Sequence, residues 1–126
     1  MSNHHTAAAL IPAHTGYLNA LDADANPAQV VVRDGAGAAL ATFTLSDPAG
    51  TVNGTTGQLT LTDAGGSYTA SATGQAVDAQ IQDGAGTVFS VLPVIKHNAA
   101  VPGYCVLNEV DLTSGMSLIL VGLTVG

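Results

Sequence analysis

The stretch that decides the fold is Gln29-Val-Val-Val-Arg33, which runs directly into the turn Asp34-Gly-Ala-Gly37. The same four-residue turn returns at Asp83-Gly-Ala-Gly86, after the alternating stretch Ala79-Gln-Ile-Gln82. Asp-Gly between alternating apolar stretches is the strongest short-range hairpin signal, because its glycine adopts the positive φ that such turns require. The sequence therefore predicts two β-hairpins.

The repeated turn has two interpretations. The two strand-turn-strand units could be copies of one half of the domain, or two unrelated hairpins could share a favourable turn. The residues that flank the two turns have little in common. We therefore favour two independent hairpins.

The rest of the chain after Pro27 continues as a series of strands. Gln58–Thr62 alternates with Leu59 and Leu61 on one face, and residues 116–125 close the chain in the same way. Thr87–Ile95 is almost continuously apolar and suits a central strand, although Pro93 indicates an edge or a bulge near its end. About seven or eight strands with short turns predict an all-β fold, an antiparallel β-sandwich of Greek-key or jelly-roll type over residues 28–126.

Residues 1–27 differ from this pattern. They hold three of the four histidines, and a short helix is plausible from Gly16 to Asp22. Asp24-Ala-Asn-Pro27 should end that helix, because proline disfavours helical geometry at the residue before it. We interpret residues 1–27 as an extended N-terminal arm with a short helical or irregular segment.

Charge is scarce in this chain of 126 residues. Charged residues make up 9%, whereas about 25% is usual, and the only formal cations are Arg33 and Lys96. Binding to nucleic acid or to an anionic membrane requires clustered Lys and Arg, so both partners are excluded. A small surface this poor in charge predicts contact with other protein, and hence homo-oligomers. The alternative is a soluble monomer covered with Thr, Ser, Asn and Gln.

The single cysteine excludes a disulfide within the chain. Cys105 lies in the apolar stretch Tyr104–Leu107, which favours a buried thiol over a reactive one. Residues 1–6 lack the cationic start of a signal peptide, and no run of about 18 apolar residues is present. The sequence therefore predicts a protein that is made and used without export.

Two patterns resemble metal sites without completing one. Asp22-Ala-Asp-Ala-Asn26 begins like a calcium loop, but Pro27 and Arg33 stand where that loop needs glycine and glutamate. The histidines at positions 4, 5, 14 and 97 lack the spacing of a zinc site. We expect no metal and no cofactor.

One pair of acids could in principle catalyse hydrolysis. Glu109 and Asp111 are two residues apart, and on a strand they would share a face. They lie in what reads as a turn, where solvated acids are common. No nucleophile motif and no phosphate-binding loop accompanies them. We predict that the chain is not an enzyme, and we assign no catalytic residue.

The order of several motifs resembles that of small β-rich virion proteins of tailed bacteriophages. They are Leu18-Asn-Ala-Leu21, Val30-Val-Val-Arg-Asp-Gly35, Leu40-Ala-Thr-Phe-Thr-Leu-Ser-Asp-Pro48, Gly57-Gln-Leu-Thr-Leu61, Ile81-Gln-Asp-Gly84, Asp111-Leu-Thr-Ser-Gly115 and the closing strand Met116–Val125. The likeness covers most of residues 17–126. Where such proteins often carry an aromatic and arginine-containing strand before the second turn, this chain has Val77–Ile81.

The resemblance implies a structural role in the virion, assembled in the host cytoplasm. Its first expectation is a capsid decoration, or cement, protein that oligomerises and binds the major capsid protein. Its second is a tail, neck or fibre position. A bacterial surface or adhesin-type binding module is a further alternative. We expect residues 1–20 and the last strand to make the contacts, and deletion of residues 2–15 to abolish particle binding but leave the fold intact.

Overall fold

The structure is a computed structural model, and it describes residues 7–23, 26–55, 58–65, 68–99, 101 and 103–125. One helix precedes eleven strands. The elements are α1 (Ala7–Leu21), β1 (Gln29–Arg33), β2 (Ala39–Val52), β3 (Leu59–Asp63), β4 (Tyr68–Thr69), β5 (Gly74–Gln75), β6 (Asp78–Gln82), β7 (Val88–Lys96), β8 (Cys105–Leu107), β9 (Asp111–Leu112), β10 (Ser117–Leu118) and β11 (Leu120–Val125).

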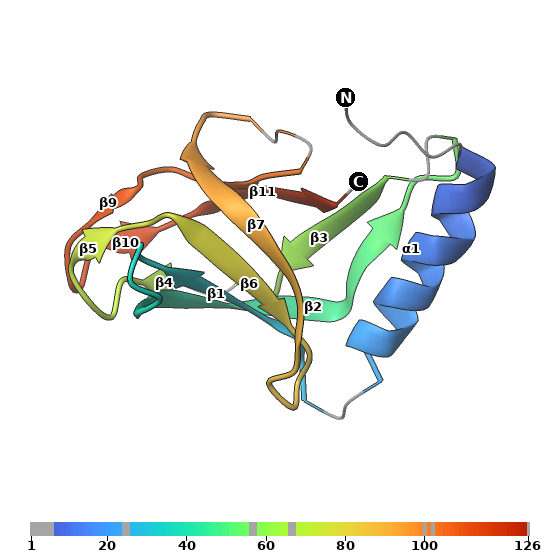
Figure 1. Cartoon of the computed structure of the whole chain (residues 1–126), viewed down its shortest axis with the longest axis horizontal. Helices are drawn as coiled ribbons and strands as arrows, with labels where there is room; N and C mark the ends of the chain where they lie inside the picture. The colour runs from blue at the N-terminus through green and yellow to red at the C-terminus, as the bar shows by residue number, and fades with distance from the viewer. Residues whose placement is uncertain are drawn as a thin grey trace.

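Seven strands close into a barrel in the order β1-β2-β3-β11-β8-β7-β6, with β6 returning to β1 (Figure 1). The predicted open sandwich of Greek-key or jelly-roll type is therefore wrong. The expectation of purely antiparallel pairing is also wrong, because β7 and β8 run parallel. Closure depends on the pairs β1–β6 and β3–β11, which join segments far apart in the sequence. Hairpin signals report only local pairing, so they do not reveal closure.

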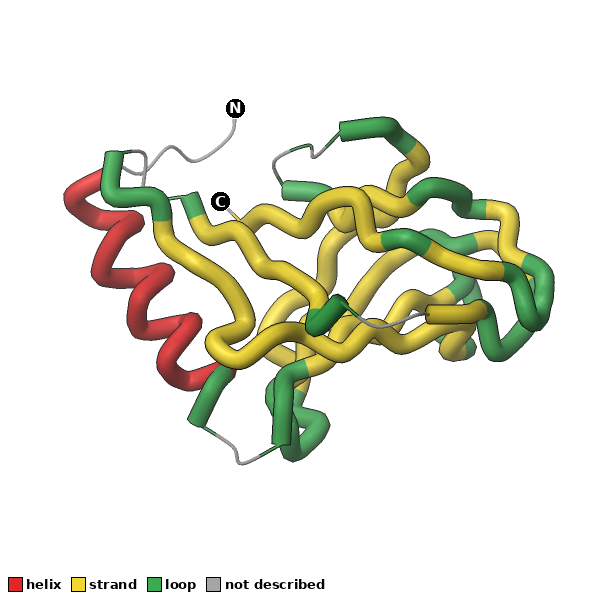
Figure 2. Tube along the Cα trace, turned by 180° about the vertical axis from the view of Figure 1, so that it is seen from behind, coloured by secondary structure: helices red, strands yellow, loops and turns green. Residues whose placement is uncertain are grey.

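Different elements occupy the two ends of the barrel. At one end lie two short ribbons, formed by β4 with β10 and by β5 with β9. Helix α1 lies at the other end, and the view from behind shows the same arrangement (Figure 2). Phe43 and Tyr68, whose rings are 4.8 Å apart, join the barrel interior to the ribbon end.

The core lies inside the barrel and follows the alternation of the strands. Val30 and Val32 of β1 and Ala79 and Ile81 of β6 are buried, as the period-2 pattern predicts. Leu59 and Leu61 also face inward, as predicted. The largest fully buried side chains are Phe43, Leu21, Leu40, Leu45, Leu59, Ile81, Leu107, Leu123, Val30, Val32, Val106 and Cys105.

Residues 7–21 form a helix rather than an extended arm, and residues 1–6 of the expected arm lie outside the described residues. Helix α1 begins at Ala7, well before the predicted Gly16, and it includes Pro12. Proline inside a helix is costly, and here the packing of the helix on the barrel outweighs that cost. Leu21 is fully buried, and the Tyr17 ring lies 5.4 Å from that of Phe89 in an edge-to-face contact.

The end of α1 is tied to a bend in β2. The pairing of β2 with β3 is interrupted between Leu45 and Gly50. Within this interruption, the Ala49 amide donates to both carboxylate oxygens of Asp22, at 3.0 and 3.2 Å. Asp22 thereby holds the helix end against the strand.

Both predicted hairpins are present, but the reason given for their turns is wrong. The positive φ belongs to the fourth residue of each turn, Gly37 (85°) and Gly86 (90°), and not to the glycine that follows the aspartate. Each loop closes with a bond from the aspartate amide, Asp34 to the Ala38 carbonyl and Asp83 to the Thr87 carbonyl, both at 3.0 Å. These are three-residue loops with a left-handed glycine, not two-residue loops.

The two hairpins form a pseudo-twofold pair. Positions 49 residues apart, the spacing of Asp34 and Asp83, are equivalent. At the centre of the β1–β6 pairing, Val31 lies opposite its equivalent Gln80. Val31 also lies opposite Thr42 of β2, and in the same way Gln80 lies opposite Val91 of β7. The registers match throughout, bulges included, although residues 28–46 and 77–95 share no identity outside the turn.

One further strand prediction needs correction. The last strand was expected to keep one apolar face, but an irregularity between Leu120 and Gly122 shifts its register. As a result Ile119 is exposed whereas Leu123 is buried. Of the helices in the described ranges, none has the length and apolar character needed to span a membrane.

Candidate interaction surface

The outer face of the four neighbouring strands β2-β1-β6-β7 is a candidate interaction surface. Because the buried residues of β1 and β6 point inward, the alternate residues point outward. A row of uncharged side chains crosses the middle of this face, and it consists of Thr42, Val31, Gln80 and Val91. Its composition is that of a sheet face that can lie against another protein.

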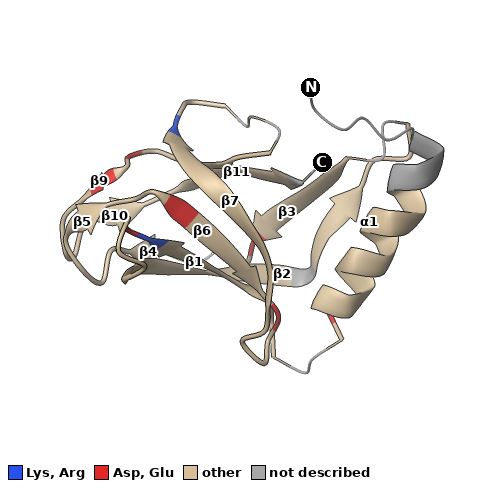
Figure 3. Cartoon of the chain, in the orientation of Figure 1, with Lys and Arg blue, Asp and Glu red and all other residues tan. Residues whose placement is uncertain are grey.

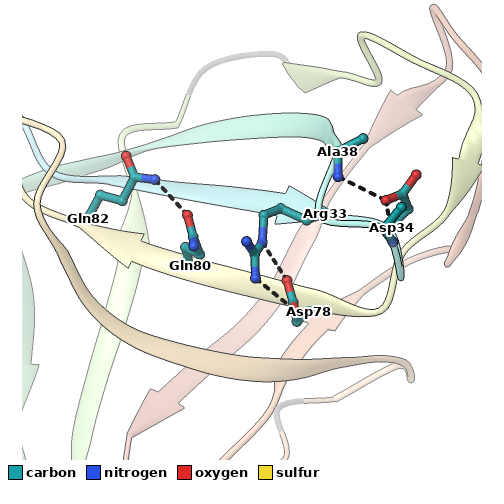
Figure 4. Close-up of polar contacts among 7 residues, drawn as sticks. Arg33, Asp34, Ala38, Asp78, Gln80 and Gln82 are labelled. Carbon is teal, nitrogen blue, oxygen red and sulfur yellow. Dashed lines mark hydrogen bonds and ion pairs between the residues drawn. The ribbon is translucent and has the colours of Figure 1, made fainter.

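The charges on this face neutralise one another. Arg33 of β1 donates from Nε to Asp78 Oδ1 at 2.8 Å and from Nη2 to Asp78 Oδ2 at 2.9 Å (Figure 4). This two-pronged hydrogen bond raises the pKa of the Arg33 guanidinium. Gln82 Nε2 donates to Gln80 Oε1 at 3.0 Å on the same face. The face therefore carries no unpaired charge between β1 and β6, and in Figure 3 most of the described ribbon is free of charged residues.

Large apolar side chains are exposed at the β7 side of this face. Val88 and Val91 are 42% and 51% exposed. Pro93 is exposed beside them. Exposed apolar groups gathered on one sheet face indicate contact with a partner, whereas scattered ones do not. We call Val88, Val91 and Pro93 the β7 patch.

A second concave surface lies near the far end of β7. It is a shallow groove of about 570 Å³, lined by Lys96, His97, Asn98, Asn108 and Val121. Lys96 Nζ donates to Glu109 Oε2 at 3.1 Å, and the exposed Ile119 bonds through its amide to Asn108 Oδ1 at 2.9 Å. The groove brings together one cation, one imidazole and amides, but no nucleophile with an adjacent base.

The predicted carboxylate pair is not arranged as a catalytic pair. Glu109 Oε1 accepts the amides of Val110 (2.9 Å) and Asp111 (3.3 Å), and Oε2 accepts from Lys96. The Val110 amide, then Lys96, lowers the pKa of Glu109. A general acid in hydrolysis needs a raised pKa. Glu109 therefore acts as an anchor for the turn, and Asp111 is exposed in β9.

The structure brings no metal ligands together in the described part of the chain. No group of three or more His, Cys, Asp or Glu residues in those ranges could hold an ion. His14 is buried in α1, His97 is exposed, and Asp22 bonds to β2. Residues 4 and 5, and Asp24 of the calcium-like pattern, lie outside the described residues.

Cys105 is inward and inert, as its apolar surroundings predicted. It is fully buried in β8, and desolvation raises the pKa of its thiol to about 12. Thiolate is the reactive form of cysteine, so this side chain packs as a small apolar group.

Sequence reasoning missed the β7 patch. The continuous apolar run of Thr87–Ile95 predicted a central strand covered on both sides, but the outer face of β7 is exposed. Val77 lies just before β6 begins and is exposed, although Ala79 and Ile81, at alternate positions after it, are buried. The one available signal was Pro93, which indicated an edge.

Comparison with known proteins finds no relative: no family model, no curated protein and no solved structure matches this chain.

Proposed function

We propose that this protein is a structural component of a tailed-phage virion, and specifically a capsid decoration protein that binds the major capsid protein and stabilises the shell. The observation that carries the proposal is the outer face of β2-β1-β6-β7, where Arg33 and Asp78 are paired and a row of uncharged side chains crosses the middle, with the β7 patch at its side. The order of motifs from Leu18 to Val125 supports the same role through its likeness to phage virion proteins.

Electrostatics supports docking on protein rather than on nucleic acid. The chain carries a net charge of −7 and has two cations, and each of them is paired with a carboxylate. Phosphate binding requires free cations, so apolar and hydrogen-bonding contact is the driving force that this face can supply.

The proposal assigns the contact to a different region from the one expected first. Residues 7–21 form a helix whose Leu21 and Tyr17 pack on the barrel, so they are part of the fold and not a free arm. Deletion of residues 2–15 would remove more than half of α1, and it would not leave the fold intact as expected. A test of particle binding therefore needs surface substitutions instead of this deletion.

The experiment is co-sedimentation of the purified protein with shells that lack it, prepared from a phage deleted for the gene. Wild-type protein should bind to saturation in a fixed ratio to shell subunits and raise the temperature at which shells open. The variant Val88→Lys should bind weakly. The control Asn19→Lys puts the same charge at an exposed position on α1, outside this sheet face, and should bind normally.

Three results would contradict the proposal. The first is wild-type protein that stays in the supernatant with every shell preparation. The second is binding to tails alone, which would place the protein at a tail, neck or fibre position. The third is binding to bacterial surfaces without binding to any phage particle, which would favour the adhesin-type module.

A further inference from the structure

One edge of β7 lacks a partner strand over most of its length. On one side β7 pairs with β6 from Val88 to Pro93. On the other side it pairs with β8 only from Val94 to Lys96. Within the described ranges, no strand pairs with this second edge before Val94. The barrel is therefore closed by a short parallel contact, with an open stretch of β7 beside it.

The direction of the backbone at this edge follows from one hydrogen bond. The Val94 amide donates to the Val77 carbonyl at 3.0 Å, so the backbone amide and carbonyl of Val94 point toward the β6 side. Backbone groups of successive residues point to opposite sides of a strand, so those of Val91 and Pro93 point toward the open edge. Val91 presents both an amide and a carbonyl there, whereas Pro93 presents only a carbonyl.

The pseudo-twofold equivalent of this edge is the outer edge of β2, and its carbonyls accept hydrogen bonds from the rest of the chain. There the Leu40 carbonyl accepts the Ser71 amide at 2.7 Å, and the Thr44 carbonyl accepts the Ala64 amide at 2.9 Å. Tyr68 Oη also donates to the Thr44 carbonyl, at 3.0 Å. The chain thus covers one of the two equivalent edges with its own segment from Ala64 to Ser71.

Burial of the inward side chains records the same difference. In β2, Leu40, Ala41 and Phe43 are at most 1% exposed. Their equivalents in β7, which are Phe89, Ser90 and Leu92, are only half-buried. Tyr17 of α1 contacts two of them, through the Phe89 ring and a 2.9 Å bond to Ser90 Oγ. The interior beside β7 is thus less covered than the interior beside β2.

Charge favours a second copy of the chain as the missing cover. Copies of a protein with net charge −7 repel one another at most orientations. Strand β7 carries no charge from Val88 to Ile95, and Asp78 of the neighbouring β6 is neutralised by Arg33. Two copies can therefore meet at this edge without opposing like charges.

We propose that β7 pairs antiparallel with β7 of a second copy, about a two-fold axis through Val91. Each Val91 amide then donates to the Val91 carbonyl of the other copy, and the two β-branched side chains form a cross-strand pair. The sheet β2-β1-β6-β7 continues across the axis into its copy. Such an isologous contact uses the same edge twice, so it closes as a dimer.

Pro93 limits the pairing to this dimer. It has no amide to offer a longer partner strand, which is how exposed edges avoid uncontrolled growth. The far side of the continuous sheet is β2, where the Leu40 and Thr44 carbonyls already accept bonds from Ser71, Ala64 and Tyr68. Among the described residues, this edge is therefore less available than that of β7 for growth into a fibre.

The test compares Val91→Lys with Thr42→Lys by light scattering coupled to size exclusion, over a wide range of protein concentration. Thr42 is the pseudo-twofold equivalent of Val91 and is also exposed, so both variants change the net charge equally. We expect dimers for the wild type and for Thr42→Lys. We expect monomers for Val91→Lys, because two lysines would face each other across the axis.

Hydrogen exchange supplies a second readout that needs no substitution. The Val91 amide of the wild type should be protected at concentrations where the dimer forms and should lose protection on dilution. A wild type that is monomeric at every concentration, a Val91→Lys variant that remains dimeric, or a Val91 amide that exchanges freely in the dimer would each overturn the inference.

This inference adds a self-association surface to the proposed function, and the two can fail separately. A monomer that still saturates shells would overturn the edge pairing alone. A dimer that ignores every shell would overturn the virion role alone. Protection of the Val91 amide only on shells, with a monomer in solution, would assign this edge to a strand of the shell protein and overturn the dimer.

Discussion

Gly50 shows how a single residue allows the barrel to close at its bend. A Cβ at this position would overlap the Thr60 carbonyl oxygen and would also press on Leu61 of β3. β2 resumes its pairing with β3 at this residue, after the interruption that begins at Leu45. The strands can approach this closely only because glycine has no side chain.

We predict that Gly50→Ala lowers the free energy of unfolding by about 1–3 kcal/mol, the usual cost of forcing atoms into a packed region. The control is Gly54→Ala, since a Cβ there meets nothing within 4 Å and the φ angle is not left-handed. Urea denaturation of the two variants measures the difference. Equal stability of both variants would show that the β2–β3 contact is looser than described.

The low pKa of Glu109 predicts a specific pH dependence of stability. A carboxylate whose pKa is lower in the folded state stabilises the fold above its ordinary pKa of 4.5, and this contribution is lost as the pH falls through the lowered value. Glu109→Gln should therefore be less stable than the wild type at neutral pH. The difference should vanish in acid, as thermal unfolding across a pH series would show.

The same series distinguishes the causes of the shift. Lys96→Met should keep part of the pH dependence, because the largest cause is the backbone amide of Val110 and not the lysine. Loss of the whole effect in Lys96→Met would contradict this order of causes.

At the scale of elements, substitutions in the repeated turn can show which of its two glycines contributes more to stability. Gly37 has the left-handed φ of 85°, whereas Gly35 does not. Gly37→Ala should cost about 1–2 kcal/mol in unfolding free energy, because Cβ crowds the carbonyl in that conformation. Gly35→Ala should cost clearly less, since a Cβ there comes only to 3.8 Å of Val77. A larger cost at Gly35 would restore the two-residue turn that the sequence favoured.

Helix α1 should behave as part of the core. Leu21 is fully buried among core residues, so Leu21→Ala should cost about 2–5 kcal/mol. The control Asn19→Ala changes an exposed position on the same helix and should have little effect. Chemical denaturation measures both, and a Leu21→Ala variant as stable as the wild type would support the original interpretation of residues 1–27 as an arm.

Local patterns in the sequence predicted most individual strands but not their surroundings. Alternation correctly placed Val30, Val32, Leu59 and Leu61 inside, because the period of a strand is a property of the backbone. Alternation does not hold at Leu40, because Leu40 and its neighbour Ala41 are both buried where the pairing with β1 has a bulge. Bulges depend on the partner strand, so no pattern within one strand reveals them.

At the scale of the whole molecule, the barrel could not be read from the sequence. The pairings of Val31 with Gln80 and of Thr60 with Thr124 join distant segments, and neither has a local signal. The candidate surface was missed for the same reason: the apolar run of β7 resembles a buried strand until the absence of a second partner before Val94 is known. The low charge was the one global property that indicated contact with other protein.

The pseudo-twofold arrangement gives the molecule one covered and one open copy of the same edge. The β4 segment covers β2 through Tyr68, whereas within the described residues no strand pairs with the equivalent edge of β7 before Val94.

The most direct test of the proposed virion role is to search purified tailed-phage particles for this chain and to count its copies by quantitative mass spectrometry against the major capsid protein. We predict a fixed ratio to the capsid subunit, retained through repeated purification and lost only when the gene is deleted. A handful of copies per particle, or none, would contradict a role in decorating the shell.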